Sequence, residues 1–145
     1  MDKRNKKVLV AIDGSKNSKR AILEARRHIK MFDSEISLLT VIHPSFPGYH
    51  RFLEQDQRQE IEEEKLESHP DLDEALELLG KTDAEVSTQI KFGDPANQIL
   101  ETAEKGNYDL IIMGSRGRGR FSQTILGSTS NKVLNHAKMN VLIVK

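Results

Sequence analysis

The sequence predicts an α/β fold: one domain over residues 1–145, with a doubly wound, five-stranded parallel sheet and helices on both faces. Apolar runs of strand length alternate with stretches of helical spacing along the whole chain. The connections between the runs are long enough for parallel crossovers, which are right-handed. A chain of 145 residues can bury about two-thirds of its unfolded surface around one core.

Five segments are predicted strands. Three of them are apolar throughout and a fourth is apolar except at Ser37 and Thr40, which is typical of strands covered on both faces. The other alternates apolar and polar residues over 86–92 and is therefore expected near a sheet edge. The five segments are Val8–Ile12, Ile36–Ile42, Val86–Phe92, Leu110–Met113 and Val141–Val144.

The segments between the strands are predicted helices, apart from a loop over residues 45–57. The second helical segment is either one kinked helix or two short ones, because Pro70 separates residues 60–67 from the apolar stripe of residues 72–79. Gly80 is expected to end it. The other three segments carry apolar residues at helical spacing. These are Ala21, Ile22, Ala25, Ile29 and Phe32 in the first; Ala96, Ile99, Leu100 and Ala103 in the third, which begins at Asp94-Pro95; and Val133, Leu134 and Ala137 in the last.

Composition excludes several classes of function. The chain has 22 basic and 22 acidic residues, so no net charge draws it to nucleic acid or to an anionic membrane. It has no cysteine, which excludes disulfides, thiolate nucleophiles and cysteine metal sites and is compatible with a reducing compartment. The first apolar run, residues 8–12, is too short for a signal-peptide core or a membrane span. We therefore expect a cytoplasmic protein.

A glycine-rich segment carries the strongest functional signal. Gly114-Ser115-Arg116-Gly117 follows a predicted strand, and Gly127-Ser128 precedes a predicted helix nine residues later. Loop N–H groups and a helix N-terminus at such a place bind phosphate, and the arginines at 116, 118 and 120 could add charge. A glycine-rich surface loop with solvated arginines is the alternative. The second glycine at a helix start favours phosphate binding.

Asp13, at the end of the first strand, is a second candidate. If the first and fourth strands are neighbours, Asp13 faces Gly114 across the crevice where such folds bind ligands. A carboxylate there could hold Mg²⁺ between phosphates or accept a bond from a ribose hydroxyl. Alternatively, Asp13 is only the first residue of a turn. Neither the P-loop pattern nor the Rossmann fingerprint is present.

The spacing Gly114-x2-Gly117-x9-Gly127-Ser128 resembles the ATP-binding motif of the universal stress protein family, and the likeness extends over the whole chain. The resemblance implies an adenine nucleotide alpha hydrolase-like fold with strand order 3-2-1-4-5. It also implies a homodimer and bound ATP with Mg²⁺, or Mn²⁺ in its place. By similarity, Asp13 contacts ribose or metal and Val41 meets the adenine, next to Ala11, where many members have proline. The phosphates and ribose would then be held by Met113, Gly114, Arg116, Gly117, Gly127, Ser128, Thr129 and Ser130.

The leading interpretation is an ATP-dependent regulator of the stress response, with at most slow hydrolysis. No catalytic residue is predicted, because none of the five histidines is paired with a nucleophile or an orienting carboxylate. An ATP-using enzyme of related fold is the alternative, although Asp13-Gly14-Ser15 does not match the motif of adenylating enzymes. Binding of RNA or DNA through residues 116–120 is disfavoured by the neutral chain. The expected partners are an adenine nucleotide, a second copy through edge strand Val141–Val144, and an unidentified protein; nucleic acid and membrane are not expected.

Overall fold

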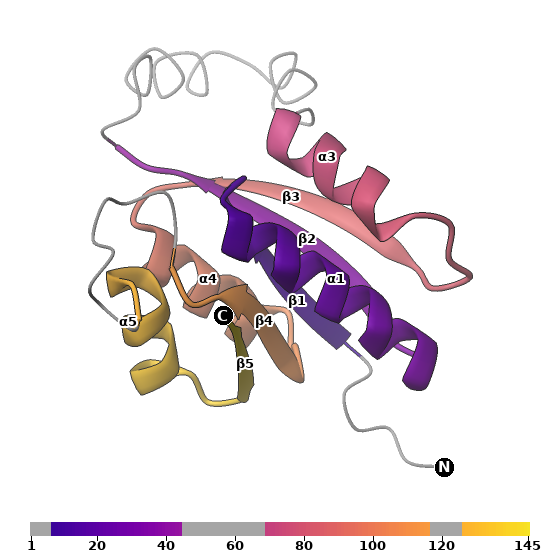
Figure 1. Cartoon of the computed structure of the whole chain (residues 1–145). Helices are drawn as coiled ribbons and strands as arrows, with labels where there is room; N and C mark the ends of the chain where they lie inside the picture. Colours follow the sequence, from indigo (N-terminus) through magenta and orange to yellow (C-terminus); the bar gives the residue numbers. More distant parts are fainter. Residues whose placement is uncertain (1–6, 45–68, 117–125) are drawn as a thin grey trace, which may run out of the picture.

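The structure, a computed structural model, describes residues 7–44, 69–116 and 126–145. It contains a five-stranded parallel sheet of order β3-β2-β1-β4-β5, which confirms the predicted fold class and strand order (Figure 1). The strands are Lys7–Ile12 (β1), Glu35–Ile42 (β2), Val86–Phe92 (β3), Leu110–Gly114 (β4) and Asn140–Val144 (β5). The strand with alternating residues, β3, is an edge strand as predicted.

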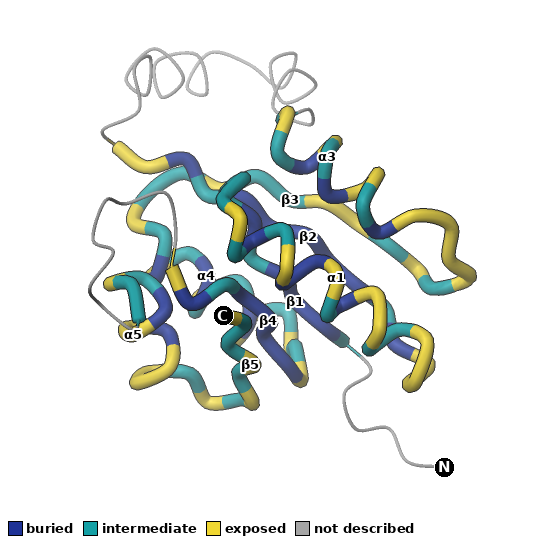
Figure 2. The backbone as a smooth tube through the Cα atoms, viewed as in Figure 1, coloured by how far each residue is buried: buried dark blue, intermediate teal, exposed yellow. Residues whose placement is uncertain are grey.

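Helices cover both faces of the sheet (Figure 1). α1 (Lys16–Met31) and α3 (Pro70–Leu79) cover one face, and α4 (Pro95–Lys105) and α5 (Ser128–His136) cover the other. Because side chains alternate along a strand, Val8 and Val10 of β1 pack under α1 and α3, whereas Leu9 packs under α4 and α5. The buried apolar residues lie on the strands β1, β2 and β4 and on the inner stripes of the helices (Figure 2).

Capping residues and prolines in the sequence explain where the helices begin. Ser15 caps α1, because its hydroxyl accepts from the Ser18 N–H at 3.1 Å. Asp94 caps α4 in the same way and Pro95 occupies the first turn, as predicted. Pro70 lies in the first turn of α3 and therefore starts this helix, while Gly80 ends it with φ of 73°. The expectations for residues 45–57 and 60–67 lie outside the described residues.

The predicted apolar face of the last helix is wrong in part. Val133 is fully buried and Ala137, at the C-cap, packs against the same core, but Leu134 is 45% exposed. α5 has nine residues and covers the sheet at β4 and the edge strand β5. The stripe of α5 that contacts the sheet is therefore narrow. Val133 and Leu134 are about 100° apart around the helix, so they cannot both lie in this stripe.

Candidate functional site

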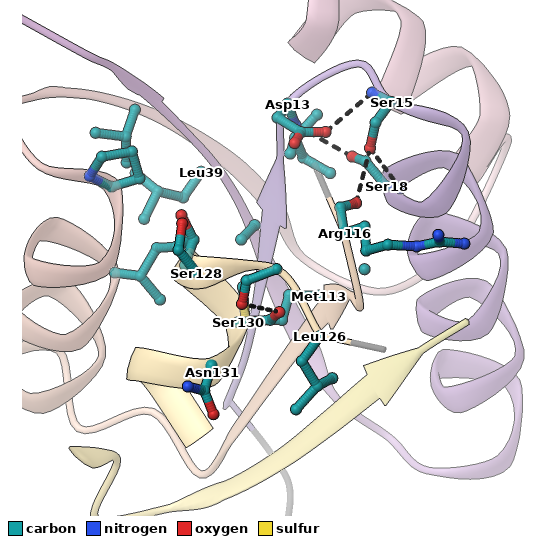
Figure 3. A pocket seen from close by; sticks show the side chains of 18 residues that line it. Asp13, Ser15, Ser18, Leu39, Met113, Arg116, Leu126, Ser128, Ser130 and Asn131 are labelled. Atoms are coloured by element: carbon teal, nitrogen blue, oxygen red, sulfur yellow. Dashed lines mark hydrogen bonds between the residues drawn. The ribbon is translucent and has the colours of Figure 1, made fainter. Parts of the chain in front are cut away.

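A cavity of about 520 Å³ lies at the carboxyl ends of β1 and β4, where the strand order reverses (Figure 3). This is the usual ligand site of open α/β sheets. Its walls come from the ends of β1, β2 and β4, from the first turns of α1 and α5, and from one side of α4. The sheet brings segments that are far apart in sequence into one site.

Ten of the eleven predicted site residues line this cavity. Gly117, the other one, lies outside the described residues. The ten are Ala11, Asp13, Val41, Met113, Gly114, Arg116, Gly127, Ser128, Thr129 and Ser130.

Sequence reasoning missed an apolar part of the wall. Leu39 from β2 and Pro95 and Ile99 from α4 line the cavity with Val41. Pro95 and Ile99 are four residues apart and so share one side of α4. The helical pattern assigned Ile99 to the core. The structure confirms this, because Ile99 is 3% exposed, and it also places Ile99 in the cavity wall. Spacing along α4 alone could not show that this side borders a cavity.

The N-terminus of α5 forms a polar wall. Gly127 is the N-cap residue and has no side chain to cap the helix, whereas α1, α3 and α4 are capped by the side chains of Ser15, His69 and Asp94. The first-turn N–H groups of Ser128 to Ser130 lack acceptors within the helix. Together with the helix dipole they favour an anion at this point of the cavity.

Two of the glycines in the motif are not required by their backbone conformation. Gly127 has φ of −70° and ψ of 166°, which any residue can adopt, and Gly114 is not in the left-handed region either. At Gly114 the requirement is space, because a Cβ atom would lie 2.8 Å from the backbone carbonyl carbon of Asn17. Glycine at 114 therefore allows α1 to approach the end of β4.

Asp13 takes part in a turn and also borders the cavity. Its Oδ1 accepts from the Ser15 N–H at 2.9 Å, and its own N–H donates to Ser18 Oγ at 3.1 Å (Figure 3). The turn interpretation is thus correct, and Asp13 is also the carboxylate of the described residues that lines the cavity.

The Asp13 carboxylate supplies hard oxygen donors, which suit Mg²⁺. The described residues contain no group of three or more acidic, histidine or cysteine side chains able to hold a metal ion. A Mg²⁺ ion at Asp13 would therefore take its other ligands from phosphate groups and water.

Arg116 contributes less charge to the cavity than the sequence suggests. Its side chain extends toward α1 and away from the first turn of α5 (Figure 3). Its backbone carbonyl accepts from the Ser15 hydroxyl at 3.5 Å. The other arginines of the glycine-rich segment lie outside the described residues.

An ion pair joins the two helices that form one wall. Lys132 Nζ of α5 lies 3.4 Å from Asp94 Oδ2 at the start of α4. The pKa of Asp94 is lowered from its ordinary value of 3.8, first by the hydrogen bond from the Asn97 N–H and then, against the opposing effect of burial, by Lys132. The carboxylate thus stays charged at neutral pH and links α4 to α5.

No helix in residues 7–44, 69–116 or 126–145 has the length and apolar character needed to cross a bilayer.

Comparison with known proteins agrees with this architecture. The model of the universal stress protein family matches residues 4–145. Universal stress protein MJ0531 of Methanocaldococcus jannaschii is 33% identical over 143 residues, covering 97% of this chain and 82% of the relative. The chain therefore belongs to the universal stress protein family.

Solved structures share the fold over nearly the whole chain. Universal stress protein UspA from Lactobacillus plantarum has a TM-score of 0.77 at 24% identity, covering 99% of this chain and 100% of the other. The universal stress protein from Archaeoglobus fulgidus, solved in complex with dAMP, has a TM-score of 0.64 at 21% identity and covers 95% and 96%.

Proposed function

We propose that the protein binds an adenine nucleotide, ATP with Mg²⁺, in the cavity and acts as a nucleotide-dependent regulator in the stress response. The observation that carries the proposal is the uncapped N-terminus of α5, which faces an apolar slot and a carboxylate at the point where the strand order reverses. The dAMP complex of a protein with the same fold supports an adenine nucleotide as the ligand.

The chemistry of the cavity suits the two ends of a nucleotide. Leu39, Val41, Pro95 and Ile99 give an apolar slot for the flat face of a base. The N–H groups at the start of α5 can bind phosphate oxygens without a formal positive charge. On the opposite wall, Asp13 can accept from a ribose hydroxyl or share a Mg²⁺ ion with the phosphates.

Regulation is favoured over turnover. Asp13, the carboxylate lining the described part of the cavity, already accepts a hydrogen bond from Ser15, and no histidine of that part lines the cavity. We therefore expect any hydrolysis to be far slower than the roughly 10 s⁻¹ of a typical enzyme. Fast steady-state hydrolysis by the isolated protein would instead favour an ATP-using enzyme. A cytoplasmic location, consistent with the lack of cysteine, belongs to this proposal.

A second copy of the chain is the proposed protein partner, through β5. The Val144 carbonyl accepts from the Ser115 N–H, so it points inward from the sheet edge. Because backbone groups alternate along a strand, those of Val141 and Ile143 point outward and are available to another strand. Leu142, between them, is 40% exposed. Two β5 strands could therefore pair antiparallel about Leu142 in an isologous interface.

Substitution of Gly127 tests nucleotide binding. The backbone angles of Gly127 suit valine, so Gly127→Val should fold normally, but its side chain would stand where phosphate must approach α5. We expect titration calorimetry to show ATP binding with Mg²⁺ by the unmodified chain and none by the variant. Asn135→Val, at the exposed far end of the same helix, is the matched control and should bind normally. Lack of binding at millimolar ATP, or binding that survives Gly127→Val, would contradict the proposal.

A further inference from the structure

Ser115, the residue directly after β4, is bonded to three other elements. Its N–H donates to the carbonyl of Val144 at the end of β5, at 2.8 Å. Its carbonyl accepts from the Gly127 N–H at 2.6 Å and from Ser130 Oγ at 2.7 Å, both at the start of α5. Its hydroxyl accepts from Asn17 Nδ2 of α1 at 3.0 Å. With 2% of its surface exposed, Ser115 is a buried junction.

The hydroxyl of Ser130 is engaged inside this junction. It lies 2.7 Å from the Ser115 carbonyl and 3.1 Å from the Gly127 carbonyl, and the residue is 2% exposed. A hydroxyl has one proton to donate, and here the proton is shared between protein acceptors. The backbone N–H of Ser130 belongs to the first turn of α5, which lines the cavity, but its hydroxyl is occupied.

We propose that the Ser130 hydroxyl is a positioning group that fixes the first turn of α5 to the Ser115 carbonyl, and that Ser115 transmits occupancy of the cavity to edge strand β5. The inference rests on the proposed nucleotide function for its ligand. An anion bound at the first turn of α5 would restrain that turn. It would thereby also restrain the two hydrogen bonds that the Gly127 N–H and the Ser130 hydroxyl donate to the Ser115 carbonyl. The N–H of Ser115 donates to the carbonyl of Val144, the last residue of β5. Ser115 therefore couples the start of α5 to the end of β5.

The effect should be measurable at β5 because, among the described residues, this strand has a single neighbouring strand, β4. It is also only five residues long. The bond from Ser115 secures its last residue, next to the pair Gly114 and Val144 in the β4–β5 register. Holding Ser115 still therefore orders the end of β5, and with it the edge proposed to meet a second copy.

Amide hydrogen exchange tests the junction without any ligand. The N–H groups of Gly127 and Ser115 report its two sides, and those of core strand β4 report global unfolding. In Ser130→Ala we expect both reporters to exchange roughly three to ten times faster relative to the core, as for the loss of one hydrogen bond. Asn135→Ala, which removes a polar side chain from the exposed far end of the same helix, should leave both unchanged. If Ser130→Ala does not fold, Ser130→Cys keeps the size with a weaker donor.

Saturating ATP with Mg²⁺ then tests the transmission. In the unmodified chain and in Asn135→Ala, ATP should slow exchange of the Ser115 amide several-fold. In Ser130→Ala, this slowing should be largely lost even at saturation. Equal slowing in Ser130→Ala would overturn the inference, as would reporters unchanged by Ser130→Ala without ligand. Binding with no response at Ser115 refutes the transmission alone. Absence of ATP binding in calorimetry refutes the proposed function, and the transmission with it.

Discussion

Gly114→Ala gives the sharpest test of how β4 and α1 fit together. The added Cβ would lie 2.8 Å from the Asn17 carbonyl carbon and 3.0 Å from its oxygen, closer than the 3.4 Å at which ordinary contact begins. Since these atoms are backbone, α1 would have to withdraw by roughly half an ångström, and such overpacking costs about 1–3 kcal/mol. Restricting the unfolded chain returns about 0.4–1 kcal/mol. The centres of these two ranges give a net loss of about 1.3 kcal/mol, or about 3–5 °C in Tm.

Thermal and urea unfolding of Gly114→Ala measure this loss, and calorimetry with ATP measures its effect on the cavity. Gly80→Ala is the control of similar cost, because Gly80 has φ of 73° with nothing near its Cβ position and lies at the far end of α3. Both variants should be destabilised, but only Gly114→Ala should also weaken ATP binding. A Gly114→Ala protein as stable as the unmodified chain would refute the close approach of α1 to β4.

Substitutions at three further residues have defined outcomes. Because the pKa of Asp94 is lowered in the folded state, its contribution to stability is present above its ordinary value of 3.8 and is lost as pH falls through the lower folded value. Asp94→Asn should keep the helix cap but remove this acid dependence. Asp94→Ala should lower the free energy of unfolding by about 1 kcal/mol at pH 7. Unfolding measured as a function of pH checks both outcomes. Asp13→Asn should abolish the strengthening of ATP binding by Mg²⁺, and unchanged metal dependence in calorimetry would leave Asp13 as a turn residue. Ile143→Pro removes an outward N–H that the sheet does not use, so sedimentation should show a folded monomer; an unchanged sedimentation coefficient for the variant would exclude β5 as the interface.

The strand pattern of the sequence predicted the fold correctly because each strand is a short segment, mainly apolar in four cases and alternating in β3, that is bounded by a turn or cap. Strand boundaries differ by only one residue, for example at Lys7 and Gly114. The last helix was predicted less well. Its buried stripe depends on its position over the sheet edge, which no local pattern encodes, and Leu134 was therefore placed on the wrong side.

The candidate site was predictable at the ends of β1 and β4 because parallel strands end at one edge of the sheet. Two kinds of information were missing. The apolar wall from Pro95 and Ile99 depends on how α4 crosses the sheet. The roles of Gly114 and Ser130 depend on contacts with Asn17 and Ser115, which are distant in sequence. Glycines and serines fit several roles, so their residue type alone could not distinguish a ligand contact from a packing requirement.

The two edges of the sheet differ, and this difference limits how far copies of the chain could assemble. β5 presents Leu142 at its edge, whereas β3 exposes Ser87, Thr88 and Lys91. If both edges were apolar, each copy could add strands on two sides and the sheets would grow into a fibre. A lysine on an edge strand opposes such growth. If β5 of one copy paired with β5 of another, the edge able to accept a further strand would be covered in both copies. Assembly would then stop at the dimer.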